Sequence, residues 1–227
     1  MKVELKSITP NAEVNIVEIA RVSSSRKDKK ESPEGLINYL IKNKHWSPFQ
    51  HSYLTFEITT SKAIAIQYLR HLSFTFQEFS QRYAKVTALE PMEFRLQAET
   101  NRQSSTDVVG FIEQYNGVIN AFVPENDTKE EISDWLAEVA DNLQITLDLY
   151  NKGLELGIAK ECARMILPMT TQTTLYMTGS VRSWIHLMEI RDDSHAQKEA
   201  QLIAQEIKKI FIKELPLISK ARGYKLN

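Results

Sequence analysis

Apolar residues recur at two different spacings along the first sixty residues of the chain. Residues 2–8 alternate between apolar and polar side chains, as in an edge strand, whereas residues 12–22 carry apolar side chains at helical spacing. A second helix is predicted from Pro33, because Ser32 can cap it and a proline costs no hydrogen bond in the first helical turn. Residues 52–60 alternate again, which predicts a second strand.

The next predicted helix is capped by Ser61 and extends over residues 62–72. Gln67, Arg70 and His71 lie three and four residues apart in this segment, so a helix would place them on one face. A candidate binding surface therefore begins on this helix.

The second half of the chain is predicted to be mainly helical. A β-rich segment near residues 86–96 precedes two long patterns of helical spacing, over residues 107–122 and 129–156. Residues 171–179 are rich in Thr, Leu and Tyr, which predicts a further strand.

A charged helix is predicted after this strand. Arg182, His186 and Glu189 follow one another at spacings of four and three residues, and Arg191 ends the helix. A final helix is expected to begin with Ser194 as its cap.

The organisation of the chain is that of a single domain over residues 1–227. Glycine and proline are scattered rather than gathered into a linker, and no internal repeat occurs. The polar run over residues 23–35 predicts a mobile loop.

Composition is that of a soluble globular protein. Apolar residues make up 42% and charged residues 25% of the 227 residues, and a net charge of -1 with a pI near 6.5 argues against nucleic acid as a partner. No apolar run approaches the length of a membrane span and no signal-peptide core is present, so we expect a cytoplasmic protein with no membrane partner. The single cysteine, Cys162, excludes an internal disulfide and fits a reducing compartment.

Candidate chemistry is concentrated in residues 70–83, which contain two arginines, a histidine, a glutamate and four hydroxyl groups. Arginine binds phosphate through two parallel hydrogen bonds, and a glutamate can accept a hydrogen bond from a ribose hydroxyl or a base. The segment therefore predicts a site for a small nucleotide. The chain has no GxGxxG or P-loop pattern, so side chains and a helix end must hold the phosphates.

Several arginines lie beside apolar residues, where each must pair internally or face a ligand: Arg70, Arg82, Arg164, Arg182 and Arg191. Few acids lie near them in the sequence, which favours an anionic ligand. Asp192 and Asp193 could instead pair with Arg191, and this alternative is left open. Lys208 and Lys209 lie on a polar helix face and are expected to be solvated.

No metal site is predicted. The five histidines lack the tight spacing of a metal motif such as H-E-x-x-H, and one cysteine cannot build a cysteine-rich zinc site. Cys162 has apolar neighbours and is expected to pack in the core, with a nucleophilic role as the alternative.

A set of motifs resembles, in order and spacing, those of the flavin-dependent thymidylate synthases. That family is marked by Arg-His-Arg, seven residues and Ser, matched here by Arg70, His71, Leu72 and Ser80. The continuation EFSQRY resembles the family's Glu-Leu-Ser-Gly-Arg-Tyr, and HWSPFQH upstream resembles His-x-Thr-Pro-Phe-Glu-His. Downstream, NRQSS, ARMILP and SVRSWIHLMEIRDDSHAQKE resemble further family segments, so that the resemblance spans residues 20–199.

The resemblance implies the fold and the reaction of this family. The fold would be α/β (α+β), with a central mixed sheet flanked by long helices, assembled as a homotetramer whose active sites are shared between subunits. The reaction would be reductive methylation of dUMP to dTMP, with methylenetetrahydrofolate as carbon donor and FAD reduced by NADPH. In this family the flavin, and not a cysteine nucleophile, carries the difficult step.

The resemblance also implies the site residues, by position. The residues that would bind dUMP are Gln67, Arg70, Glu78, Phe79, Ser80, Gln81, Arg82, Arg164 and Arg191. The residues that would contact FAD are Ser23, Ser47, Gln50, Arg70, His71, Leu72, Gln77, Glu78, Ser180, Arg182 and His186. Arg164 would reach the phosphate from another subunit, and Arg191 matches the family's activating arginine, whose cation would stabilise negative charge developing on the pyrimidine.

Four residues on the presumed flavin side depart from the family pattern. Leu72 stands in place of an arginine and Gln50 in place of a glutamate, while Gln77 and Ser180 each stand in place of an asparagine. Loss of one charge-assisted contact costs about 1.5–3 kcal/mol, so weaker or shifted FAD binding is expected. Two alternative functions are left open: a related enzyme that releases a hydroxymethyl nucleotide, and a dUMP-binding oligomer without turnover.

Overall fold

The structure, a computed structural model, describes residues 1–23, 32–100, 104–124 and 129–225. The chain divides into two compact units whose segments interleave along the sequence. Unit 1 comprises Met1, Thr59–Tyr68 and Glu78–Leu175, and unit 2 comprises Lys2–Ile58, Leu69–Gln77 and Tyr176–Asn227. Most of the mobile loop predicted over residues 23–35 lies outside the described residues.

The mixed α/β class predicted from the sequence is confirmed, but the described strands form two sheets instead of one central sheet. The first sheet has four strands in the order β1–β2–β7–β3. These strands are β1 (Lys2–Ile8), β2 (Tyr53–Ser61), β7 (Gln172–Ser180) and β3 (Phe74–Glu78). β1 lies at the edge, as predicted, and the residues of β2, β3 and β7 are divided between the two units.

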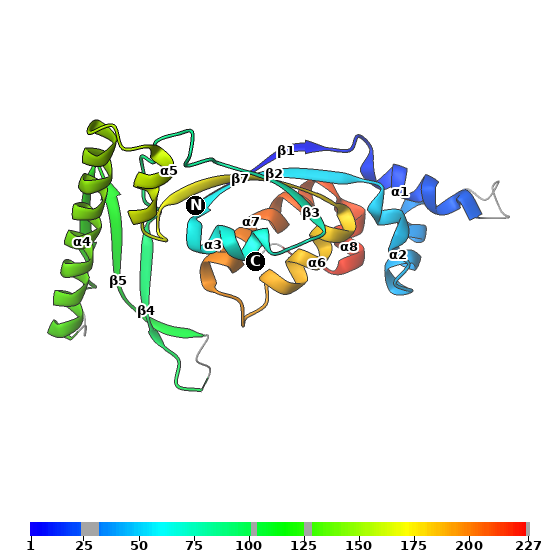
Figure 1. Cartoon of the computed structure of the whole chain (residues 1–227). Helices are drawn as coiled ribbons and strands as arrows, with labels where there is room; N and C mark the ends of the chain where they lie inside the picture. Colours follow the sequence, from blue (N-terminus) through cyan, green and yellow to red (C-terminus); the bar gives the residue numbers. More distant parts are fainter. Residues whose placement is uncertain (24–31, 101–103, 125–128, 226–227) are drawn as a thin grey trace. The chain divides into compact units, whose positions relative to one another are not determined.

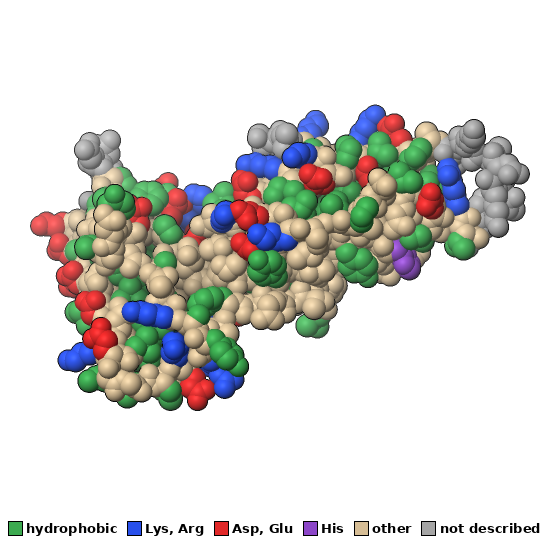
Figure 2. Space-filling model, turned by 90° about the horizontal axis from the view of Figure 1, so that it is seen from above, with side chains coloured by type: hydrophobic (Ala, Val, Ile, Leu, Met, Phe, Trp, Pro, Cys, Tyr) green, Lys and Arg blue, Asp and Glu red, His purple; other side chains and the backbone are tan. Residues whose placement is uncertain are grey.

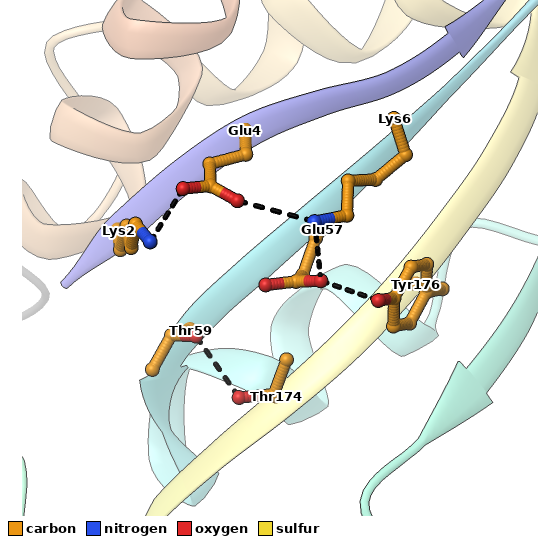
Figure 3. Close-up of polar contacts among 7 residues, drawn as sticks. All are labelled: Lys2, Glu4, Lys6, Glu57, Thr59, Thr174 and Tyr176. Carbon is orange, nitrogen blue, oxygen red and sulfur yellow. Dashed lines mark hydrogen bonds and ion pairs between the residues drawn. The ribbon is translucent and has the colours of Figure 1, made fainter.

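Polar side chains pair across the strands on one face of this sheet (Figure 3). Thr59 Oγ1 lies 2.9 Å from Thr174 Oγ1, and the Tyr176 hydroxyl donates to Glu57. Position 57 thus meets 176 while 59 meets 174, so β2 and β7 run antiparallel. Glu57 also pairs with Lys6 of β1 at 3.0 Å, and such cross-strand pairs stabilise the register of the sheet.

The core of unit 2 forms around a buried tryptophan. Trp184 lies in α6 (Val181–Arg191), and its ring centroid is 4.8 Å from that of Phe56 and 4.6 Å from that of Phe74. Its indole N–H donates to Leu54 O at 3.1 Å, so the polar end of the ring is also satisfied. The other α-helices described in unit 2 are α1 (Ala12–Ala20), α2 (Pro33–Lys42), α7 (Lys198–Glu214) and α8 (Pro216–Arg222) (Figure 1).

Unit 1 contains a three-stranded antiparallel sheet covered by one long helix (Figure 1). Its strands are β4 (Met92–Gln97), β5 (Ser105–Tyr115) and β6 (Val118–Phe122), and the helix is α4 (Glu130–Glu155). Ile112, Ile119 and Leu136 are the centre of the apolar layer between sheet and helix. α4 confirms the helix predicted over residues 129–156.

The helix predicted over residues 107–122 is wrong, because this segment forms the β5–β6 hairpin. The apolar residues of this segment recur at helical spacing, but the two residues between the strands do not have helical φ angles. Asn116 and Gly117 join the strands with φ angles of 50° and 85°, the left-handed pair that a tight hairpin turn requires. The Asn-Gly dipeptide, which favours a hairpin turn, was therefore a stronger signal than the helical spacing of the apolar residues.

The helix capped by Ser61 is confirmed as α3 (Lys62–Leu69), and Ser61 Oγ accepts from the backbone amide three residues on at 3.3 Å. However, α3 ends before the motif begins. Arg70 and His71 lie in the following turn, in which Phe74 N donates to His71 O at 3.2 Å. The prediction that they share one helical face with Gln67 is therefore wrong.

Two other helix starts test the capping predictions. Ser32 caps α2 by accepting from Gly35 N at 3.3 Å, as predicted. Ser194 does not cap α7, which begins after Gln197, because residues 193–196 form a turn of their own. The last helix of the described residues is not α7 but α8, which begins at a proline.

Charged side chains of both signs are interspersed on the face shown in Figure 2. No helix in the described parts of the chain is both long and apolar enough to cross a membrane.

Candidate active site

Arg191 and His71 form the central pair of the site in unit 2. Arg191 is the last residue of α6, and its Nε donates to His71 Nε2 at 3.0 Å. The imidazole nitrogen must be unprotonated to accept this bond, which places the proton of the neutral ring on Nδ1. Burial, the charge of Arg191 and that of His186, in this order, lower the pKa of His71 from 6.5 to about 4. At neutral pH the pair therefore presents a cation held by a neutral imidazole.

The beginning of α6 is fixed by hydroxyl groups. Ser180 is buried, and its Oγ accepts from Ser183 N at 3.2 Å, as an N-cap does. Ser183 Oγ in turn donates to Ser73 O at 3.3 Å, which ties the helix to the segment after His71. The predicted FAD contact of Ser180 remains a prediction, and the structure gives this serine a capping role.

A cavity of about 340 Å³ lies along α6 and η2 (Ser47–Gln50). Three of the residues predicted to contact FAD, Gln50, Arg182 and His186, line it together. The remaining described lining residues are Trp46, Ser73, Ser183, Ile185 and Glu189. A cation, an imidazole and an amide thus converge on one partly apolar cavity, as in sites for small molecules.

Trp46 is one of the cavity residues that were not predicted from the sequence. It lies inside the HWSPFQH segment, and an aromatic residue beside a matched motif was the available signal. Glu189 was visible as the third member of the spacing that begins at Arg182 and His186, and in the structure it lies 3.8 Å from His186 Nδ1.

The other predicted flavin residues of unit 2 do not join this cavity. Leu72, which stands in place of the family's arginine, is 94% exposed and points into solvent. The side chains of Ser47, Arg70 and Gln77 are also exposed and are not among the described lining residues. Ser23 ends η1 (Arg21–Ser23), and its side chain lies outside the described residues.

In unit 1, the second half of the motif is held by β7. Glu78 Oε1 accepts from Lys62 Nζ at 2.8 Å and from Thr173 Oγ1 at 2.9 Å, so this carboxylate is anchored on two sides. Phe79 N donates to Thr174 O at 2.8 Å, which extends the strand pairing by one residue.

The chain forms a turn directly after Phe79. Ser80 O accepts from the amides of Tyr83 and Ala84 at 3.0 Å, and Gln81 is buried within this turn. Gln67, also predicted to bind dUMP, lies half-buried in α3 of the same unit.

Glu161 contacts both of the arginines in unit 1 that are predicted to bind dUMP. Arg82 Nε donates to its carboxylate at 3.1 Å, and Arg164 Nε donates to its backbone oxygen at 3.4 Å. Glu161 lies in α5 (Lys160–Ala163), and Arg164 begins η3 (Arg164–Ile166). Cys162, beside Glu161, is exposed, so the prediction of a core cysteine is wrong.

The aspartates that follow Arg191 have partners of their own. Asp192 accepts from Gln205 at 3.0 Å and from Lys208 at 2.8 Å. Lys208 therefore forms an ion pair, whereas a solvated side chain was expected from the sequence. Asp193 pairs with His195 at 2.7 Å, and the hydrogen bonds from His195 lower the pKa of its carboxyl group. In the described part of the chain, no group of three or more His, Cys, Asp or Glu side chains could hold a metal ion.

Comparisons with known proteins agree with this arrangement of motifs. The family model described as "Thymidylate synthase complementing protein" matches residues 4–217. A probable flavin-dependent thymidylate synthase of Paramecium bursaria Chlorella virus 1 is 45% identical over 213 residues, which cover 92% of this chain and 90% of that protein. The flavin-dependent thymidylate synthase of Synechocystis sp. is 42% identical over 203 residues, covering 89% and 85%.

A solved structure shows the same similarity in three dimensions. The crystal structure of the UMP/dUMP methylase PolB from Streptomyces cacaoi, bound with 5-Br dUMP, has a TM-score of 0.74 and 25% sequence identity. The similarity covers 98% of this chain and 94% of that one. The chain therefore belongs to the family of flavin-dependent thymidylate synthases.

Proposed function

We propose that this chain catalyses the reductive methylation of dUMP to dTMP, with methylenetetrahydrofolate as carbon donor and FAD reduced by NADPH. The observation that carries the proposal is the family match over residues 4–217, which includes every predicted site residue. The names of the relatives support flavin dependence, and the methylase solved with 5-Br dUMP supports the nucleotide.

The side chains around the unit 2 cavity suit part of FAD. Arg182 offers paired donors for a pyrophosphate, His186 and Gln50 offer further hydrogen bonds, and Trp46 offers an aromatic face. When bound, FAD supplies the reducing equivalents that the methyl group requires. Ser23, Ser47, Arg70, His71, Leu72, Gln77, Glu78 and Ser180 are proposed as further flavin contacts.

Arg191 is proposed as the residue that activates the pyrimidine. Its guanidinium is always charged, and it stabilises negative charge that develops on the uracil ring and makes C5 nucleophilic. His71 fixes the guanidinium through Nε and adds no competing positive charge, because its imidazole is neutral at pH 7.

The nucleotide phosphate is proposed to bind at Arg82 of one subunit and at Arg164 of another. Within the chain, Arg82 donates to the Glu161 carboxylate and Arg164 to the Glu161 backbone oxygen, so a phosphate would replace one of these hydrogen bonds at each arginine. Gln67, Arg70, Glu78, Phe79, Ser80 and Gln81 are proposed to complete the dUMP site.

We further propose that both units act as one domain in a cytoplasmic homotetramer with shared active sites. The single family model that spans both units supports their assignment to one domain. Ile145 and Leu149, four residues apart on α4, are 56% and 54% exposed, and a partner subunit would bury such a surface.

The test is anaerobic incubation with FAD, NADPH, methylenetetrahydrofolate and dUMP, followed by mass analysis of the nucleotide. Formation of dTMP by the wild type, with at least a hundredfold slower formation by Arg191→Ala, would support the proposal. A hydroxymethyl nucleotide, or dUMP binding without any product, would contradict it in favour of the two alternatives.

A further inference from the structure

Arg222, the last residue of α8, contacts two residues that line the unit 2 cavity. One terminal nitrogen of its guanidinium forms an ion pair with Glu189. Its Cζ lies 5.8 Å from the centroid of the Trp46 ring, within the range of a cation–π contact. Both partners line the cavity, whereas Arg222 itself lies beyond the 4–217 segment that the family model matches.

The position of Arg222 is set by how α8 is held. Ile218 is buried, and its amide donates to Glu13 Oε1 at 2.8 Å, which anchors the helix to α1. Gly223 ends the helix with a φ of 68°, the left-handed conformation typical of a helix carboxy terminus. The Tyr224 amide then donates to Ser219 O at 2.9 Å, which turns the Tyr224 ring towards Arg222.

Arg222 is also largely withdrawn from solvent. Its side chain is 23% exposed, and its Nε is a buried donor without a hydrogen-bond acceptor among the described residues. A guanidinium in this position is rigid, because Trp46 and Tyr224 each have a ring centroid 5.8 Å from its Cζ and Glu189 binds one edge. Removing it would take away one contact from Trp46 and one from Glu189.

We propose that Arg222 is a positioning residue for FAD, because it holds the Trp46 ring and the Glu189 carboxylate as one wall of the cavity. The Trp46 ring offers a stacking surface for a planar group, and Glu189 can accept from ribose or ribityl hydroxyls. The inference rests on the proposed function for the identity of the ligand, and it assigns a role to a segment outside the family motifs.

The experiment compares Arg222→Ala with Lys220→Ala in the full-length protein. Lys220 lies on the same short helix and pairs with Glu34 at 2.6 Å, so its loss also removes one ion pair of α8 but none at the cavity. Titration with FAD, followed by flavin fluorescence, should show a Kd about five- to tenfold higher for Arg222→Ala and within about twofold of wild type for Lys220→Ala.

A double-mutant cycle with Trp46→Ala separates positioning from general destabilisation. If Arg222 acts through Trp46, Arg222→Ala should raise the FAD Kd by about twofold or less when Trp46 is already absent. Equal effects of Arg222→Ala in both backgrounds, or equal effects of the two α8 variants, would overturn the inference. A wild type that binds FAD but forms no dTMP would overturn only the proposed reaction, whereas a wild type that binds no FAD would overturn both.

Discussion

Arg191 Nε donates to Nε2 of His71 at 3.0 Å, although the two residues lie 120 positions apart in the sequence. The bond joins the end of α6 to the turn that follows α3. Because it uses Nε, it fixes the plane of the guanidinium rather than only its position. Because the imidazole is neutral, this bond adds no charge beside the guanidinium.

The first prediction is that Arg191→Ala slows chemistry more than it weakens binding. We expect kcat to fall about 10²- to 10³-fold, as when one preorganised electrostatic donor is removed from an active site. The dUMP Kd should rise by less than about tenfold. Single-turnover kinetics and calorimetric titration measure the two quantities, and a larger loss in binding than in kcat would contradict the role.

The second prediction concerns pH. The pKa of His71 is about 4 in the folded chain and near 6.5 when unfolded, so the unfolded state binds more protons between these values. The free energy of unfolding should be at its full value above about pH 6.5 and should fall, by at most about 3 kcal/mol, as the pH falls through about 4.

His71→Gln is the matched variant for this titration. Its amide oxygen can still accept from Arg191, but it binds no proton. Urea unfolding at about pH 7, 5.5 and 4.5 should therefore show a smaller loss of unfolding free energy for the variant than for the wild type. Parallel losses in both proteins would mean that other groups govern the acid sensitivity.

Local signals in the sequence were sufficient for much of the fold. Ser32 before Pro33 marks the beginning of α2, and Arg191 marks the end of α6, because capping and helix termination depend on neighbouring residues. Alternation located β1 and β2, and the Thr, Leu and Tyr content of residues 171–179 located β7; side chains of these strands pair with one another on one face of the sheet.

Contacts between distant segments could not be predicted in the same way. The bond between His71 and Arg191, and the gathering of Arg82 and Arg164 around Glu161, depend on tertiary packing. The resemblance to family motifs identified His71, Arg191, Arg82 and Arg164 as site residues. It did not show which residues they contact. Glu161 was missed altogether, since a single glutamate on a short surface helix has no sequence signature.

The third prediction is that Glu161→Gln strengthens dUMP binding. Glu161 accepts from Arg82 in the structure, and its charge competes with an incoming phosphate for the same guanidinium. The amide keeps the size but not the charge, so the dUMP Kd should fall by about two- to fivefold for this half-exposed pair. Arg82→Ala should raise the Kd, and a weaker Glu161→Gln variant would show that the carboxylate supports the site instead.

The fourth prediction concerns the effect of two glycines, Gly179 and Gly153, on the free energy of unfolding. A Cβ on Gly179 of β7 would lie 2.3 Å from the Phe74 ring, so Gly179→Ala should lower the free energy of unfolding by about 1–3 kcal/mol. Gly153 in α4 has open space at its Cβ, so Gly153→Ala should raise the free energy by about 0.5–1 kcal/mol. Denaturant unfolding of both variants tests the pair, and equal effects would contradict the close contact with Phe74.

The fifth prediction is that Cys162→Ser keeps the rate of dTMP formation within about twofold of wild type. A thiol nucleophile at the pyrimidine would make this cysteine indispensable, whereas flavin-dependent methylation does not need it. Its exposure would permit alkylation, and its neighbour Glu161 contacts Arg82, so a bulky adduct could block the nucleotide without any role in chemistry. The serine variant separates these cases: loss of activity only after alkylation of the wild type indicates a steric block, and loss in the serine variant itself would argue against the flavin route.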